Sequence, residues 1–107
     1  MARRKKRRSP VRRLGDRPSA HAREADTWLR HFRDEAAWTE ELIAKGQCHR
    51  AYRALVRMDR KATMAGVHAG RSRNESLNQR ARANNERFSK IEEEFERRCL
   101  PSLDDEM

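Results

Sequence analysis

Histidine and cysteine are the residue types that could bind a metal or act as nucleophiles in this chain, but their spacing fits neither role. The histidines form no HExxH motif and no close pair on one helix face; they are His21, His31, His49 and His68. Cys48 and Cys99 stand alone, without a CxxC spacing, so we expect two reduced thiols rather than a disulfide or a zinc site. The sequence therefore predicts no metal site and no cofactor.

Carboxylates cluster near the C-terminal end of the chain, where they are surrounded by cations. Glu92, Glu93, Glu94 and Glu96 stand beside Lys90, Arg97 and Arg98. This pattern is typical of a solvated helix face with supporting i,i+4 ion pairs. The serines have no evident base partner, and no glycine-rich phosphate loop is present. We expect no catalytic residue, and hence a protein that is not an enzyme.

The strongest chemical signal is an unbroken basic run near the start of the chain. It comprises Arg3, Arg4, Lys5, Lys6, Arg7 and Arg8, and is followed by Arg12 and Arg13. The run resembles the arginine-rich motifs of RNA-binding proteins and also simple nuclear-localisation signals, which implies nucleic-acid binding or nuclear import. Residues 1–18 carry nine Lys and Arg against one Asp and have almost nothing to bury, so we expect a disordered basic arm.

A second basic element is expected on a helix. Five cations would project within about 100° of arc on its outer face; they are Arg50, Arg53, Arg57, Arg60 and Lys61. Guanidinium groups pair with phosphate in a bidentate manner, so such a face can follow a phosphate backbone. The competing interpretation is a solvated face whose arginines pair with Glu35, Glu40 or Glu41. Two separate basic elements in one small protein favour phosphate binding.

The basic face resembles the second helix of a helix-turn-helix DNA-binding protein only in following a glycine-containing turn. Both predicted helices are longer than that compact motif uses. The face also lacks the Asn, Gln or Ser side chains that would read base edges. Contact independent of base sequence is therefore expected.

The elements that must position these cations are helices. A chain of 107 residues with 40% charged and 36% apolar residues can form one domain with a thin core. Residues 20–45 place Ala25, Leu29, Phe32, Ala36 and Ile43 on one helix face. Residues 47–69 continue with a second apolar face, and the short connection at Gly46 predicts an antiparallel αα-hairpin.

A third helix is expected over residues 73–100, beginning at a capping box formed by Ser72 and Glu75 and ending before Pro101. One face of this helix forms a seam whose positions follow steps of three and four residues, with a single polar member, Asn84; they are Leu77, Ala81, Asn84, Phe88, Ile91 and Phe95. This helix either completes a three-helix bundle or dimerises. Residues 101–107 are expected to be an acidic tail. The predicted fold class is all-α.

Four residues are candidates for contact with a protein partner. Trp38 and Leu42 lie beside the main apolar face of the first helix, where they either pack in the core or form a docking patch. Asn84 interrupts the apolar seam and could fix the register of a partner helix, with Phe88 next along the seam. A half-exposed asparagine in a polar stretch is the competing interpretation for Asn84.

The sequence thus predicts a non-enzymatic protein that binds DNA or RNA through its phosphate backbone, as a packaging, nucleoid-associated or ribonucleoprotein component. The alternative is a helical module for protein interaction or assembly, whose basic arm serves targeting or an acidic partner. A homodimer or a partner protein would use the third helix. No apolar run approaches the roughly 20 residues that span a bilayer, so a cytoplasmic, nucleoid or nuclear location is expected, and a virion component would also fit.

Overall fold

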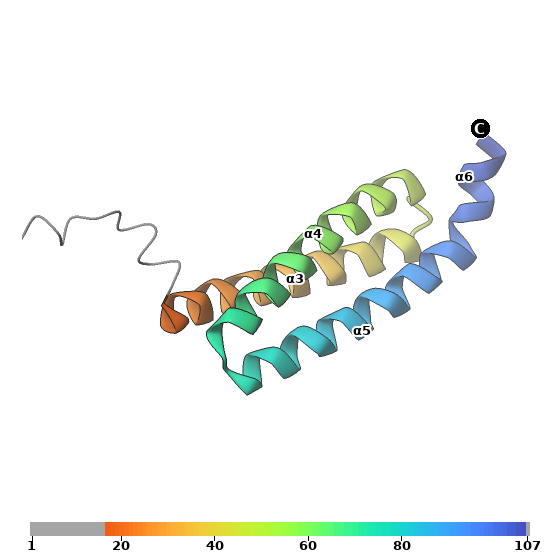
Figure 1. The fold of residues 1–107 in the computed structure, drawn as a ribbon. Helices are drawn as coiled ribbons and strands as arrows, with labels where there is room; N and C mark the ends of the chain where they lie inside the picture. Colours follow the sequence, from red (N-terminus) through yellow and green to blue (C-terminus); the bar gives the residue numbers. More distant parts are fainter. Residues whose placement is uncertain (1–16, 107) are drawn as a thin grey trace, which may run out of the picture.

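The computed structural model describes residues 17–106, and all regular structure in this range is helical (Figure 1). The helices are α3 (Pro18–Ala44), α4 (Cys48–Ser72), α5 (Glu75–Arg98) and α6 (Leu100–Glu106). No strand occurs between residues 17 and 106, so the all-α prediction is confirmed for this part of the chain. Residues 1–16 of the predicted arm lie outside the described residues.

Helices α3 and α4 run antiparallel and lie close together because small side chains line their contact. Ala25, Ala36, Ala51, Ala54 and Ala65 are almost fully buried. Between the helices, Gly46 adopts a left-handed φ of 74°, a conformation that glycine adopts at little cost, and the Gln47 N–H donates to Leu42 O at 2.9 Å. The turn therefore closes in three residues.

Helix α5 packs along the α3–α4 pair, and together they enclose two apolar clusters. The larger cluster contains the bulky side chains Phe32, Leu42, Met58, Ile91 and Phe95, among others. The smaller cluster lies toward the start of α3 and is built from Leu29, Leu77 and four alanines. The apolar core therefore becomes thinner toward the end of the molecule where α3 begins.

The corner between α4 and α5 differs from the predicted capping box. Helix α4 continues past Gly70 to Ser72, and Arg73 turns the chain with a left-handed φ of 57°. Asn74, rather than Ser72, caps α5, because its side chain accepts the Leu77 N–H at 3.1 Å. Ser72 instead accepts the Asn74 N–H, which tightens the same corner.

The C-terminal residues form a helix where a tail was expected. A proline in the interior of a helix breaks or kinks it, but Pro101 is the second residue of α6. In the first turn of a helix the missing N–H of proline is unused, so Pro101 begins α6 instead of stopping α5. The direction of the chain changes at Cys99, between the two helices.

The prediction of two reduced thiols is wrong, because Cys48 and Cys99 form a disulfide in the structure. The antiparallel arrangement of α4 and α5 brings the start of one helix to the end of the other, with the two Cα atoms 5.3 Å apart. A spacing of 51 residues contains no local motif that would announce this pair.

No helix of the described part of the chain combines the length and apolar character needed to cross a membrane.

The packing of α5 predicts unequal effects for its two phenylalanines. Phe95 is buried in the larger cluster, whereas Phe88 is only partly buried at its edge. Phe95→Ala should lower the free energy of unfolding by about 3–5 kcal/mol, as for a fully buried ring, and Phe88→Ala should lower it by clearly less. Urea denaturation followed by far-UV circular dichroism measures both, and equal losses would contradict this packing.

The disulfide should stabilise the fold by constraining the unfolded chain. For a loop of this length we expect reduction to lower the free energy of unfolding by about 2–4 kcal/mol. Urea denaturation with and without a reductant measures this loss. A variant with both Cys48→Ser and Cys99→Ser is the control and should not respond to the reductant, while an unchanged wild-type midpoint would refute the stabilisation.

Candidate nucleic-acid interface

Folding sorts the charges of the helices toward opposite ends of the molecule. Residues 17–31 and 60–84 share the end where α3 begins and carry nine Lys and Arg against three Asp and Glu, a net charge of +6. Residues 32–59 and 85–106 share the other end and carry nine against thirteen, a net charge of −4. The sequence of residues 1–16 has eight Lys and Arg against one Asp, and it joins the chain at the positive end.

The predicted basic face of α4 divides into paired and unpaired cations. Arg57 and Lys61 both bind Glu35 of α3, with N···O distances of 3.0 and 2.7 Å. The Glu35 side chain is only 9% exposed, so these ion pairs are part of the α3–α4 contact. Pairing with glutamates of the first helix was the alternative to phosphate binding, and it applies to Arg57 and Lys61, two of the five predicted cations.

Glu35 carries its negative charge because of its two partners. Burial is the largest single influence and would raise its pKa, but hydrogen bonds from Arg57 and Lys61, together with their positive charges, lower the pKa below its ordinary value of 4.5. A carboxylate with a lowered pKa stabilises the fold above pH 4.5, where it is ionised in both folded and unfolded chains. That stabilisation disappears as the pH falls through the lowered pKa.

Arg50, at the start of the same face, is held by uncharged groups. It donates to Gln47 Oε1 at 2.7 Å, and its guanidinium lies over the Trp38 ring, 5.5 Å from the ring centre. The Trp38 side chain is exposed to solvent apart from this contact, whereas Leu42 is fully buried. The two residues therefore do not form a shared docking patch: Leu42 belongs to the core and Trp38 lies under an arginine.

The remaining cations of α4 form a line along its outer surface. Arg53, Arg60 and Arg71 are exposed, and none of them pairs with a carboxylate among the side chains of residues 17–103. At 100° per residue the three lie within about 20° of one another, over a length of about 27 Å. We call these three residues the arginine line. Arg71 is not among the predicted cations because the predicted helix ends at Ala69. The residues after Gly70 contain no helix breaker, and α4 continues through them to Ser72.

Three further arginines surround the positive end of the molecule. Arg17, Arg23 and Arg73 are exposed, and none has a carboxylate partner among the described residues. Arg17 and Arg23 belong to the first turns of α3, which pack beside the last turns of α4, while Arg73 turns the chain into α5. The arginine line therefore ends in a wider cluster of cations.

His21 and His68 meet at this end, with their Nδ1 atoms 2.8 Å apart. Burial lowers the pKa of His68, and the positive charges of His21 and Arg71 lower it further while Glu24 opposes them. The two rings form a polar contact between α3 and α4.

No group of three or more His, Cys, Asp or Glu side chains in the described part of the chain could hold a metal ion. Near the end of α5, Glu94 pairs with Arg97 and with Arg98, at 3.2 Å for Arg98. Arginine is thus the side chain that dominates the surface chemistry.

The two other candidate interaction residues lie on α5. Asn84 and Phe88 are both partly buried, and Phe88 packs against the larger core cluster. Arg3, Arg4, Lys5, Lys6, Arg7, Arg8, Arg12 and Arg13 lie outside the described residues, so the structure does not place them.

Comparison with known proteins adds no relative: the chain matches no family model, no curated protein and no solved structure.

The pairing of Glu35 predicts a pH-dependent loss of stability. Glu35→Gln should lower the free energy of unfolding by about 1 kcal/mol near neutral pH, a modest value because Arg57 and Lys61 remain partly solvated. The difference from the wild type should shrink as the pH falls below 4.5 and Glu35 becomes protonated.

Urea denaturation at a series of pH values measures this difference. The matched control is Glu41→Gln, which removes an exposed carboxylate of the same helix that pairs only with Lys45. Its effect should be near zero at every pH. A Glu35→Gln effect that does not depend on pH would contradict the assigned ion pairs.

Proposed function

We propose that the protein binds nucleic acid through its phosphate backbone, with the arginine line and the basic run of residues 3–8 as the two contact elements. The arginine line carries the proposal: Arg53, Arg60 and Arg71 project from one face of α4 and pair with no carboxylate among the side chains of residues 17–103. Unpaired guanidinium groups are well suited to bidentate contact with phosphate oxygens.

The geometry of the arginine line suits a long polyanion better than a small one. Its length of about 27 Å corresponds to about eight steps of 3.4 Å along a nucleic-acid strand. Cations spread over that distance contact several phosphates at once. They position a backbone without reading bases, so the proposed binding is independent of base sequence and open to DNA and RNA.

The basic run and the arginine line would act on the same ligand. Residues 1–16 join α3 at the positive end of the molecule, where Arg17, Arg23 and Arg73 also lie. A strand bound along α4 would therefore pass the point at which residues 1–16 join α3. The negative end, by contrast, repels phosphate, so contact should be strongest at the positive end, with Arg53 extending it toward the acidic half.

We further propose that the chain acts as a monomeric three-helix bundle. Dimerisation through α5 would need its apolar seam to be free, but Leu77, Ala81, Ile91 and Phe95 of that seam are already buried within the chain. A scaffold of this kind can present the arginine line without a partner subunit.

Salt dependence tests the proposed binding. Each phosphate contact releases counterions, so the logarithm of affinity should fall linearly with the logarithm of salt concentration, with a slope of about −0.9 per contact on duplex DNA. Replacing Arg53, Arg60 and Arg71 together by Ala should make the slope shallower by about 2.7. Fluorescence anisotropy with two unrelated duplexes measures the slope and shows whether base sequence matters.

The matched control replaces Arg87, Arg97 and Arg98 by Ala, since these three arginines pair with Glu40 or Glu94 at the negative end. It removes the same formal charge and should leave the slope almost unchanged. An affinity that does not respond to salt, or equal effects of the two triple variants, would contradict the proposed interface.

A further inference from the structure

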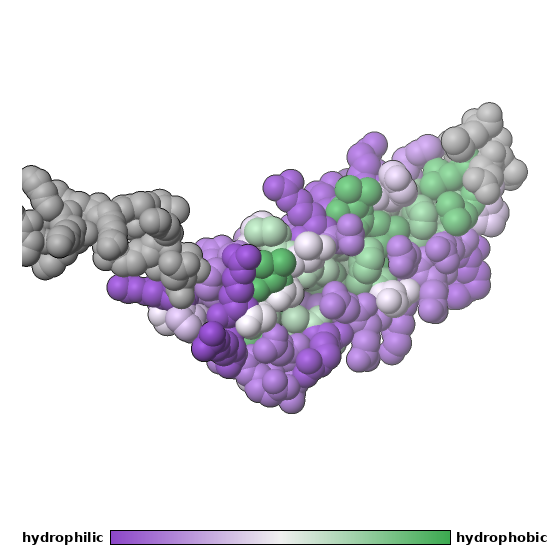
Figure 2. Space-filling view, in the orientation of Figure 1, coloured by the Kyte–Doolittle hydropathy of each residue, from purple (hydrophilic) through white to green (hydrophobic). Residues whose placement is uncertain are grey.

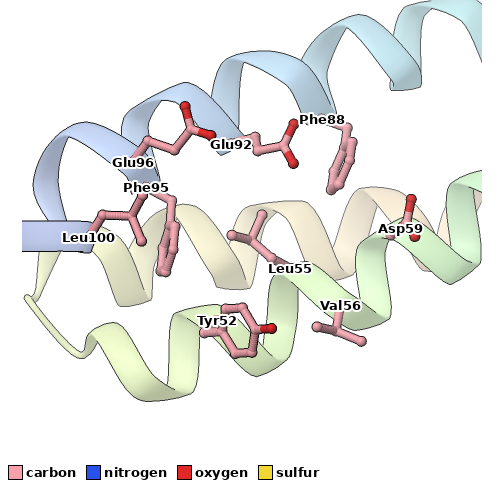
Figure 3. A pocket seen from close by; sticks show the side chains of 9 residues that line it. All are labelled: Tyr52, Leu55, Val56, Asp59, Phe88, Glu92, Phe95, Glu96 and Leu100. Atoms are coloured by element: carbon pink, nitrogen blue, oxygen red, sulfur yellow. The ribbon is translucent and has the colours of Figure 1, made fainter. Parts of the chain in front are cut away.

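A groove of about 400 Å³ between α4 and α5 leaves apolar side chains uncovered (Figure 3). It is lined by apolar or aromatic residues of three helices, namely Tyr52, Leu55, Val56, Phe88, Phe95 and Leu100. Tyr52 and Val56 are each 55% exposed and Leu100 is 39% exposed. In the space-filling view, hydrophobic surface is visible between α4 and α5 on this face of the molecule (Figure 2). An apolar surface of this kind favours an occupant that would cover it.

The rim of this α4–α5 groove is acidic. Asp59 on α4 and Glu92 and Glu96 on α5 line it, and none of the three has an ion-pair partner among residues 17–106 (Figure 3). Pairing with the same groove of a second copy would bring six carboxylates together, which like-charge repulsion disfavours. The complementary occupant is therefore a basic segment that carries an apolar residue.

The first 16 residues of this chain have that chemistry. Eight of them are Lys or Arg, and Val11 and Leu14 stand among the arginines. The next residue, Arg17, lies at the end of the molecule where α3 begins, beside the last turns of α4. No other part of the chain combines so much positive charge with isolated apolar residues.

The length of this segment matches the distance to the groove. From Ser72 at the end of α4, Asp59 is about 20 Å away along the helix and Tyr52 about 30 Å. An extended chain covers about 3.3 Å per residue, so Val11 can reach about 20 Å from Arg17, and residues 8 to 3 can reach about 30 to 46 Å. Leu14, at about 10 Å, falls short of the groove.

We propose that residues 3–11 occupy the α4–α5 groove of their own chain. Val11 lies at the near end of the groove, at the level of Asp59, and the basic run lies over the carboxylates of Asp59, Glu92 and Glu96. The covalent connection supplies an effective concentration of the order of mM, which a separate basic peptide would have to match. The basic run then cannot contact a phosphate backbone at the same time, so the groove and nucleic acid compete for it.

Nuclear magnetic resonance of the full chain, without nucleic acid, tests this proposal apart from the proposed function. Raising the salt concentration from about 0.01 M to about 1 M shortens the screening length from about 30 Å to about 3 Å. This change should release residues 3–11 and shift the amide signals of that segment together with the methyl signals of Leu55 and Val56. The shifts should be the same at every protein concentration.

Two variants of α5 with equal charge make the test specific. Glu92→Gln with Glu96→Gln removes two carboxylates from the rim and should abolish most of the salt-dependent shifts. Glu86→Gln with Glu93→Gln removes two exposed carboxylates of α5 that do not line the groove, and should preserve the shifts.

A zero-length carbodiimide cross-link gives a second readout. Lys5 or Lys6 should become joined to Asp59, Glu92 or Glu96 within a monomer, as mapped by mass spectrometry. Cross-linked dimers, or shifts that grow with protein concentration, would overturn the proposal in favour of a segment from a second copy. Salt-independent signals at Leu55 and Val56, or equal behaviour of the two double variants, would overturn it altogether.

Discussion

The close packing of α3 against α4 through alanines is the constraint on which the rest of this structure depends. A chain with 40% charged residues has few large apolar side chains, and it forms a core by bringing two helices so near that methyl groups fill the space. The few bulky side chains then gather in one cluster, where α5 completes the enclosure. Among the side chains that the structure describes, the Lys, Arg, Asp and Glu residues other than Glu35 lie at the outer surfaces or at the rims of the helix contacts.

Covalent and polar links between the helices add to this packing. The disulfide joins α4 to the residue between α5 and α6, beside the larger cluster and far from the corner at Arg73 that already connects α4 to α5. A second link joins α3 to α4 near the middle of the two helices, where Glu35 binds Arg57 and Lys61. At the opposite end, His21 and His68 contribute a polar contact between α3 and α4.

Much of this fold is predictable from local patterns, because a helix face repeats every three or four residues whatever its surroundings. The apolar face of α3 is buried as expected at Ala25, Leu29, Phe32, Ala36 and Ile43. The disulfide is a different kind of feature, since 51 residues separate its members and only the folded topology brings them together.

The same limit applies to the candidate interface. The α4 cations are recognisable from the sequence, but their division into Glu35-bound and unpaired residues depends on which helix lies beside them. Arg71 joins the line only because α4 continues for three residues beyond Ala69. Tyr52 is exposed because α5 does not cover the groove beside it.

The axial separation of charge restricts how the molecule can meet a polyanion. A body with a net charge of +6 at one end and −4 at the other is oriented by a phosphate backbone before any contact forms, since one end is attracted while the other is repelled. Glu35 lies near the boundary and neutralises Arg57 and Lys61 there, so the unpaired charge of α4 is concentrated at Arg60 and Arg71, with Arg53 as an extension toward the acidic half. The point of attachment of residues 1–16 adds to the same end. A uniformly basic surface has no preferred side, whereas the described residues of this protein concentrate their unpaired positive charge on α4 and at one end of the molecule.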